Sequence, residues 1–396
     1  MPFPQQAAAA RSTSLWCLVC GDQGGVDVLN NVLLFVPLGA GLTLLQLRVR
    51  SVVLTGIVIS FAVESLQYLG IPGRDPSLSD LLTNTAGSWV GVILGVRHGD
   101  VLWPGRRAAG VLGLAGVLAW WATQAATAAL LRPWAPSGEL RAAWASASPE
   151  GAAYEVMVTS ASVSGMAVEG DSTPLPAGLA ERIRSGLVHL EIEILAGGPA
   201  PGWSAIFKLL RQRGRVMSVE AGGRDLVVQM PARARAWRLR SPALQLHGVL
   251  QGPAGTRLRL AAGERADTLW AVATSASNRM RRQQILSPSL GWSLLVPFHY
   301  AYGSEVPWLT GLWIVGWMVP IGYWTSRARA GWYQWPWFLL VLLVGLGIVP
   351  HLMGYSAVPW SEWVAGTLGL VVGRAGSATR LNFGQTCDSP FTSESS

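Results

Sequence analysis

The chain has 396 residues, of which 50% are hydrophobic and only 13% are charged, and it contains 20 tryptophans. This composition indicates an integral membrane protein, because tryptophan favours the membrane–water interface and so few charges rarely suffice for a soluble surface. The net charge of +8 comes almost wholly from arginine, but no basic stripe interleaved with aromatic residues is present, so we expect no nucleic-acid partner.

The N-terminal segment, residues 1–25, contains Cys17 and Cys20 as a lone CxxC, and a third cysteine is Cys387. A structural zinc site usually needs two further Cys or His ligands at suitable spacing, and the neighbouring sequence offers none. We therefore predict no metal site and no cofactor, and no signal peptide is convincing. A disulfide between the two cysteines is the alternative if this end faces an oxidising compartment.

Apolar stretches of the length needed to cross a bilayer, about 17 to 25 residues, occur in two blocks. The first block, residues 26–132, holds four of them, and the second, residues 291–373, holds three. Residues 374–396 are polar and we expect a loose tail there. The seven expected spans are 28–47, 52–70, 80–96, 108–131, 307–325, 335–353 and 357–373.

Residues 133–290, between the two blocks, have a strand-like pattern instead. In "LVHLEIEIL" Val188, Leu190, Ile192 and Ile194 alternate with polar residues, which is typical of a half-buried strand. "VMSVEAGGRDLVVQM" predicts two strands joined around Gly222-Gly223, and "RAWRLR", "LQLHGVL" and "TRLRLAAG" continue the series. The fold class that we predict is a multi-pass α-helical membrane bundle of about seven helices with an inserted all-β jelly-roll sandwich domain.

The positions of the arginines predict how the chain crosses the membrane. Four connecting regions that would share one side are rich in arginine, and we assign that side to the cytoplasm. The β-rich segment 133–290 is then extracytoplasmic. The arginines concerned are Arg48, Arg50, Arg97, Arg106, Arg107, Arg327, Arg329, Arg374 and Arg380.

The two helical blocks echo each other in sequence. "FVPLG" at 35–39 matches "MVPIG" at 318–322, and "SDLLTNTAGSWVG" at 79–91 matches "SEWVAGTLGLVVG" at 361–373. The order is conserved, which favours a parallel repeat of three helices with the fourth span as connector, a 3+1+3 arrangement. The alternative is chance similarity between apolar segments.

The stretches "DVLNNVLLFVPLG" and "ESLQYLGIPGRDPSLSDLLTNTAGSWVGVILG" resemble the VanZ-like family of membrane proteins. The resemblance covers about residues 22–97 and, more loosely, 290–373. It implies a role in the cell envelope and a link to resistance against the glycopeptide teicoplanin, but no defined reaction. The central segment resembles a concanavalin-like, laminin-G-type jelly roll, carried by "GWSAIFKLLRQRGRVMSVEAGGRDLVVQM".

Polar residues at membrane depth gather at one leaflet on the predicted topology. Such residues usually face a partner or a wet cavity, so we predict an outer-leaflet polar pocket. Glu64 and Asp80 would be acid/base or cation-binding groups, and Arg74 would grip an anionic head group. The pocket candidates are Asp27, Asn31, Glu64, Gln67, Arg74, Asp80 and Asn84, with His351 and Glu362 as secondary candidates.

Structural roles compete with these assignments. Arg74 could form an internal salt bridge with Asp80 or Glu64, and Asp80 could cap its helix. Asp27 precedes a helix, where a carboxylate favours the helix dipole, and for this residue we favour the structural role. His351 is expected to be a hydrogen-bonded packing histidine.

The β-rich segment offers two further features. Trp203, Trp237 and Trp270 could stack on sugar rings, although we favour positions in the core or an interface. The arginine-rich run from Arg211 to Arg240 could meet anionic polymers or lipid head groups, with a solvated sheet face as the alternative.

We therefore favour a non-catalytic envelope protein that binds a lipid head group or glycan at the outer leaflet. One alternative is an intramembrane enzyme or transporter acting on a lipid-linked envelope precursor. Another is a membrane-anchored glycan-binding or adhesion module. The lipid bilayer is the one partner common to all three.

Overall fold

The structure is a computed structural model that describes most of the chain and divides into two compact units. Unit 1 is residues 1–96, 127–286 and 290–304, and unit 2 is residues 97–126, 287–289 and 305–396. The described residues are 19, 23–70, 78–144, 156–168, 174–175, 178–196, 199–211, 214–276, 278–298, 300–328, 331, 334–356 and 358–385. The three cysteines and Arg74 lie outside these ranges.

The N-terminal part of unit 1 contains three long helices, α2 (Gly24–Leu44), α3 (Val49–Gly70) and α4 (Leu78–Val96). Helix α4 packs closely on α2 because glycines lie at the crossing. A side chain on Gly39 would overlap the carbonyl oxygen of Ser88, and one on Gly91 would overlap that of Val36. Small residues at such crossings allow helix backbones in a membrane to approach each other.

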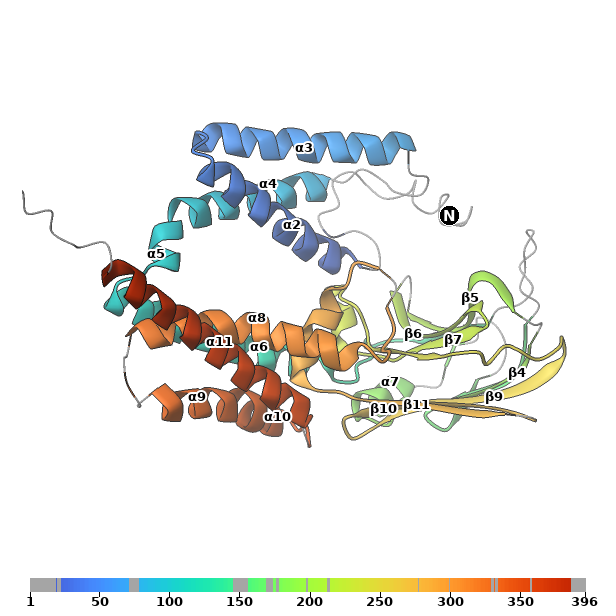
Figure 1. Ribbon diagram of the computed structural model, residues 1–396. Coiled ribbons are helices and arrows are strands. Elements are labelled where there is room, and N and C mark those ends of the chain that lie inside the picture. Colours follow the sequence, from blue (N-terminus) through green and yellow to red (C-terminus); the bar gives the residue numbers. More distant parts are fainter. Residues whose placement is uncertain are drawn as a thin grey trace, which may run out of the picture. The chain divides into compact units, whose positions relative to one another are not determined.

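Unit 2 is a helical bundle formed by α5 (His98–Leu102), α6 (Arg106–Leu131), α8 (Val306–Ala328), α9 (Gln334–Leu342), α10 (Val349–Leu352) and α11 (Trp360–Gln385) (Figure 1). A π-helical turn, Leu343–Ile348, joins α9 to α10. Trp120 of α6 is fully buried beside Ile314 and Met318 of α8. Most of α6, the expected connector, therefore packs with the second helical block.

Helices α8 and α11 also approach each other at glycines. A side chain on Gly322 would meet the carbonyl oxygen of Leu370, and one on Gly373 would overlap that of Val319. Helix α11 continues to Gln385, so the helix extends beyond residue 373, where we expected the last span to end and a loose tail to begin.

Unit 1 also holds the all-β region, which has two antiparallel sheets stacked as layers (Figure 1). One sheet has the order β1-β5-β6-β7-β8, and the other has the order β11-β10-β9-β4-β2-β3. The short helix α7 (Leu179–Arg184) precedes β4. The strands are β1 (Arg141–Trp144), β2 (Met157–Val163), β3 (Met166–Val168), β4 (His189–Ala196), β5 (Ala200–Arg211), β6 (Gly214–Gly223), β7 (Asp225–Gln229), β8 (Ala243–Leu246), β9 (Thr256–Arg265), β10 (Thr268–Ser275) and β11 (Arg279–Ile285).

Two of the strand predictions are confirmed in detail. Leu190, Ile192 and Ile194 of β4 are buried while the residues between them are more exposed, as the alternation predicts. The β6–β7 hairpin pairs Gly222 with Asp225, and Gly223 takes a φ of 59°, which glycine adopts without steric cost.

The prediction of a strand at "RAWRLR" is wrong. Residues Arg233–Trp237 form a 3-10 helix, η1. The turn ends at Arg238, whose left-handed φ of 54° reverses the chain, and the amide of Leu239 donates to the carbonyl of Ala234. The apolar-polar alternation here reflects a tight turn whose side chains point to different sides, and no strand ladder forms.

Five helical segments among the described residues are long and apolar enough to cross a membrane. They are Gly24–Leu44, Val49–Leu66, Arg106–Leu131, Val306–Ala328 and Gln334–Leu352. The other two expected spans coincide with α4 and with the first part of α11, which are helical but are not among these five. A membrane protein with an added β domain is therefore supported, and the count of seven spans stays a prediction.

Replacing Gly91 by valine tests the packing of α4 on α2. The new side chain would overlap the carbonyl of Val36, and overpacking of this kind costs about 1–3 kcal/mol. We expect a lower melting temperature of the detergent-solubilised protein, measured by tryptophan fluorescence. Gly41→Val is the matched control on α2, since nothing lies within 4 Å of its added Cβ. Equal melting temperatures for the two variants would contradict the packing described.

Replacing Glu264 by glutamine tests a partly buried carboxyl of β9. Burial raises the pKa of Glu264 to about 8, against a smaller lowering by Arg132. Because this pKa is raised in the folded state, the contribution of Glu264 to folding stability is complete below the unfolded-state pKa near 4.5. This contribution is lost as the pH rises through 8. We expect the melting temperature of the wild type to fall between pH 5 and pH 9 by more than that of Glu264→Gln. Glu181→Gln, at an exposed ion pair, should retain the wild-type slope.

Candidate functional site

The polar candidates of the first helical block come from three helices of unit 1. Asn31 lies on α2, Glu64 on α3, and Asp80 and Asn84 on α4. Gln67 is part of α3, but its side chain lies outside the described residues, as does all of Arg74. We name the set Asn31, Ser60, Glu64, Asp80 and Asn84 the polar cluster.

A hydrogen bond joins α2 to α4 within the polar cluster. The side-chain amide of Asn31 donates to Oδ1 of Asp80 over 2.7 Å. Asp80 lies in the first turn of α4, where the helix dipole also favours its negative charge. Asp80 therefore stabilises the start of α4 and also accepts the hydrogen bond that links α4 to α2.

A second hydrogen bond joins α4 to α3. The amide of Asn84 donates to Oγ of Ser60 over 2.9 Å, and both residues are buried. The other side-chain atom of Asn84, Oδ1, is buried without a hydrogen-bond partner in the described structure, and so is Oγ of Ser88, one turn further on. A buried acceptor without a partner costs about 1–3 kcal/mol. The surroundings of Asn84 and Ser88 are therefore suited to bind a hydrogen-bond donor of a ligand.

The register of α3 against α4 places the two carboxylates at one level. A side chain on Gly56 would overlap Oγ of Ser88, and Ser60 bonds Asn84 one turn later. These two contacts run in opposite directions along the two helices, so the helices are antiparallel, and one further turn along each leads to Glu64 and Asp80. Glu64 is only 9% exposed.

The polar cluster thus combines two carboxylates with two amides and a hydroxyl, largely enclosed by apolar helices. Carboxylate oxygens accept hydrogen bonds, and the amide groups both donate and accept. Such a set complements hydroxyl and amine groups, and a carboxylate pair can also transfer protons. Among the described residues, no three His, Cys, Asp or Glu side chains gather closely enough to hold a metal ion.

Asp27 lies on the same helix as Asn31, one turn nearer the start of α2. It is exposed in the first turn of α2, as its proposed dipole role requires, and its charge acts on Arg240 of the β region. Asp27 therefore combines a place in the first turn of α2 with an electrostatic interaction with the β region.

The secondary candidates lie in unit 2. Glu362 is only 4% exposed, and its Oε1 accepts a hydrogen bond of 2.6 Å from Oγ of Ser287. Its Oε2 has no partner in the described part of the chain. His351 has an exposed side chain, so the expectation of a packing histidine is wrong. Its place in the short helix α10, at the end of the bundle, leaves it outside the core.

The sequence interpretation missed Ser60, the partner of Asn84. The sequence contained a signal for Ser60, because this residue precedes Glu64 by four positions and therefore lies on the same helix face as Glu64. Small hydroxyl residues are common in apolar helices, and the sequence alone gave no reason to select this one.

The tryptophans of the β region are not core residues, contrary to the interpretation that we favoured. Trp203 is 43% exposed and Trp237 is 69% exposed. Trp270 is half-buried and lies against the ring of His189 at 5.4 Å between centroids. Trp203 and Trp270 project from strand faces outside the stacked layers, and Trp237 ends η1, so none of them points into the core.

Replacing Ser60 by alanine tests the link between α3 and α4. The variant leaves the buried amide of Asn84 without its acceptor, which costs about 1–3 kcal/mol. We expect a lower melting temperature in detergent. Ser65→Ala is the control on the same helix, because Ser65 bonds only the carbonyl of Phe61 in its own helix. A Ser60→Ala protein as stable as the control would show that the bond contributes nothing.

Comparison with known protein families finds a match for the N-terminal part of the chain. The model of the VanZ/LLP1 family matches residues 2–98. No curated protein and no solved structure matches the chain. The matched segment contains α2, α3 and α4, and hence the whole polar cluster. The resemblance inferred for residues 22–97 is thereby confirmed, while the looser one at 290–373 stays a prediction: residues 2–98 of this membrane protein form a VanZ-like domain, and a separate antiparallel β region follows later in the chain.

Proposed function

We propose that this is a cell-envelope membrane protein whose polar cluster binds the head group of an envelope lipid or the glycan attached to it. The observation that carries the proposal is the register of α3 and α4. It brings Glu64 level with Asp80, while Asn31 holds Asp80 from the third helix.

The chemistry of the cluster favours a head group with hydroxyl or amine donors. Carboxylates in apolar surroundings are costly, and they are retained where a partner or a wet cavity satisfies them. The unpartnered oxygens of Asn84 and Ser88 extend the acceptor surface along α4. Sugars and amino groups supply many donors in a small volume, whereas hydrocarbon chains supply none.

The predicted topology supports an outer-leaflet location for this site. With the arginine-rich loops in the cytoplasm, the polar cluster and residues 133–290 both belong to the extracytoplasmic side. Envelope precursors expose their sugars there, and the VanZ-like domain suggests a role in glycopeptide resistance. In this proposal the β region is a concanavalin-like domain at the membrane surface.

The proposed 3+1+3 repeat has support from matched helix contacts. Gly39 meets the carbonyl of Ser88, and Gly322 meets that of Leu370. Gly91 meets the carbonyl of Val36, and Gly373 meets that of Val319. Every one of these positions corresponds in the alignment of "FVPLG" with "MVPIG" and of the two later segments. By this repeat Glu362 is the counterpart of Asp80.

A complementation assay tests the proposed function. A strain lacking the gene would receive wild type, Glu64→Gln or Ser65→Ala, and its susceptibility to teicoplanin would be measured. We expect wild type and Ser65→Ala to raise tolerance several-fold, and Glu64→Gln to abolish the rise, because the glutamine amide is uncharged and has one acceptor oxygen where the carboxylate has two. Native mass spectrometry of the purified proteins should show bound lipid lost only in Glu64→Gln.

Two results would count against the proposal. Unchanged susceptibility with wild type would exclude the resistance role. Equal lipid retention by wild type and Glu64→Gln would exclude the polar cluster as the binding site, provided that both proteins are present in the membrane at equal amounts.

A further inference from the structure

A pocket lies on the face of the β1-β5-β6-β7-β8 sheet that points away from the core. Ser218 pairs with Gln229, which pairs with Ala243, and Glu220 pairs with Val227. These positions share one face, because side chains alternate along a strand. Yet Ser218 is 0% exposed and Glu220 is 8% exposed, so other chain segments cover this polar face.

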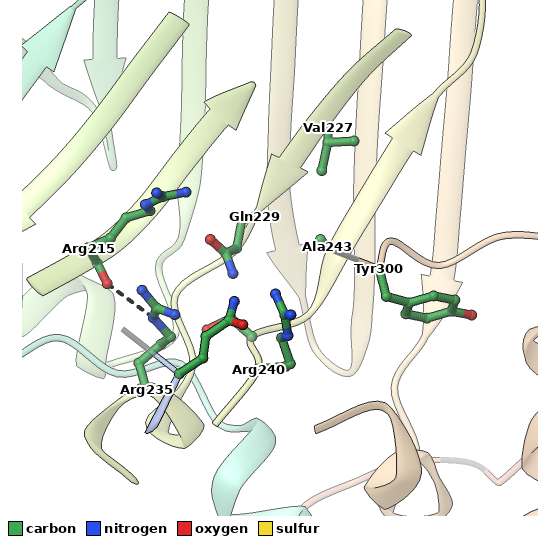
Figure 2. Close-up of a pocket in the computed structure, with 9 residues that line it drawn as sticks. Arg215, Val227, Gln229, Arg235, Arg240, Ala243 and Tyr300 are labelled. Atoms are coloured by element: carbon green, nitrogen blue, oxygen red, sulfur yellow. Dashed lines mark hydrogen bonds between the residues drawn. The ribbon is translucent and has the colours of Figure 1, made fainter. Parts of the chain in front are cut away.

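The cover consists largely of η1 and the residues that follow it. Figure 2 shows the side chains of Gln229, Arg235 and Arg240 directed into one space, with Arg215 and Tyr300 at its sides. Nε of Arg235 donates to the carbonyl oxygen of Arg215 over 3.2 Å. Nε of Arg240 donates to the carbonyl oxygen of Val296 over 2.9 Å. Both guanidinium groups are thus held in place by backbone atoms.

Charged side chains of both signs meet at this pocket. Three arginines and two carboxylates among the described residues line or adjoin it. Glu220 pairs with Arg215, and Asp27 offsets part of the charge of Arg240. Burial is the main cause that lowers the pKa of Arg240 to about 10, with a smaller contribution from the charge of Arg235, while the charges of Asp27 and Glu220 oppose the shift.

A buried hydroxyl also faces this space without a partner. Ser241 lines the pocket and is 6% exposed, and its Oγ has no hydrogen-bond partner in the described structure. The pocket measures about 90 Å³, well below the several hundred Å³ of pockets for drug-sized ligands. Its size and donors fit a single small oxyanion.

The pocket also adjoins the start of a candidate membrane span. Gln23, the residue before α2, is part of the lining. Gly25 allows this approach, because a side chain there would overlap the carbonyl oxygen of Trp237. The start of a membrane helix lies at the level of lipid head groups, and its amide groups favour anions.

We propose that Arg215, Arg235, Arg240 and Ser241 form a binding site for a phosphate group. Planar guanidinium forks bind phosphate oxygens through pairs of hydrogen bonds, and the Ser241 hydroxyl donates a further one. The phosphate comes from a lipid head group or from a soluble phosphate compound. The site shares no residue with the polar cluster, and it stands whether or not that cluster binds a ligand.

Calorimetric titration with inorganic phosphate tests the site in the full chain, held in phosphatidylcholine nanodiscs. We expect saturable binding that Arg235→Gln and Ser241→Ala each weaken, by about tenfold for the arginine, because a charged hydrogen bond is lost. Arg233→Gln is the matched control, since Arg233 is an exposed arginine of the same 3-10 helix outside the pocket lining. Melting curves without phosphate should coincide for Ser241→Ala and wild type.

Nanodiscs that also contain phosphatidic acid distinguish the two phosphate sources. Loss of inorganic phosphate binding in these discs assigns the site to a lipid head group, and unchanged binding assigns it to a soluble compound. Wild-type affinity in both Arg235→Gln and Ser241→Ala, or no saturable binding in either type of disc, would overturn the proposal. Glu64→Gln should bind phosphate like wild type, which separates this test from that of the polar cluster.

Discussion

The close approach of α2 and α4 at glycines is the contact on which the VanZ-like domain depends. Because Gly39 and Gly91 have no side chains, the backbones meet directly, and this fixes the level at which the two helices face each other. That level is what brings the amide of Asn31 within 2.7 Å of Asp80. In a bilayer, apolar side chains gain little by leaving lipid for each other, so close packing and polar links between helices must provide the specificity.

The two polar sites of unit 1 have opposite character, although Gln23, just before α2, lines one of them and Asn31 of α2 belongs to the other. The polar cluster is rich in carboxylate and amide oxygens, whereas the phosphate site that we propose is rich in guanidinium groups. Gln23 and Asn31 are eight residues apart, which corresponds to roughly 12 Å along a helix. The distance between them limits how far the two sets of side chains neutralise each other, since salt weakens Coulomb interactions between exposed groups over about 10 Å.

The sequence predicted those features that local pattern determines. The alternation in β4 and the Gly222-Gly223 hairpin follow from strand periodicity and turn chemistry, and the grouping of Asn31, Glu64, Asp80 and Asn84 follows from helix spacing and a family motif. The features that it did not predict depend on which distant segments meet. Ser60 matters only because α4 lies against it, the 3-10 turn at Arg233–Trp237 forms over a sheet face, and α6 packs with helices that follow it by more than 170 residues.

The contact of Gly25 with Trp237 joins residues that are more than 200 positions apart in the chain. A ribosome adds residues in order, at about 5–20 per second, so α2 is made many seconds before the segment that will lie against its first turn. During that interval the beginning of α2 has no β region to contact, and the tight fit at Gly25 can form only at a late stage of biogenesis. Assembly of this end of the protein is therefore governed by the completion of the insert rather than by entry of the first helix into the bilayer.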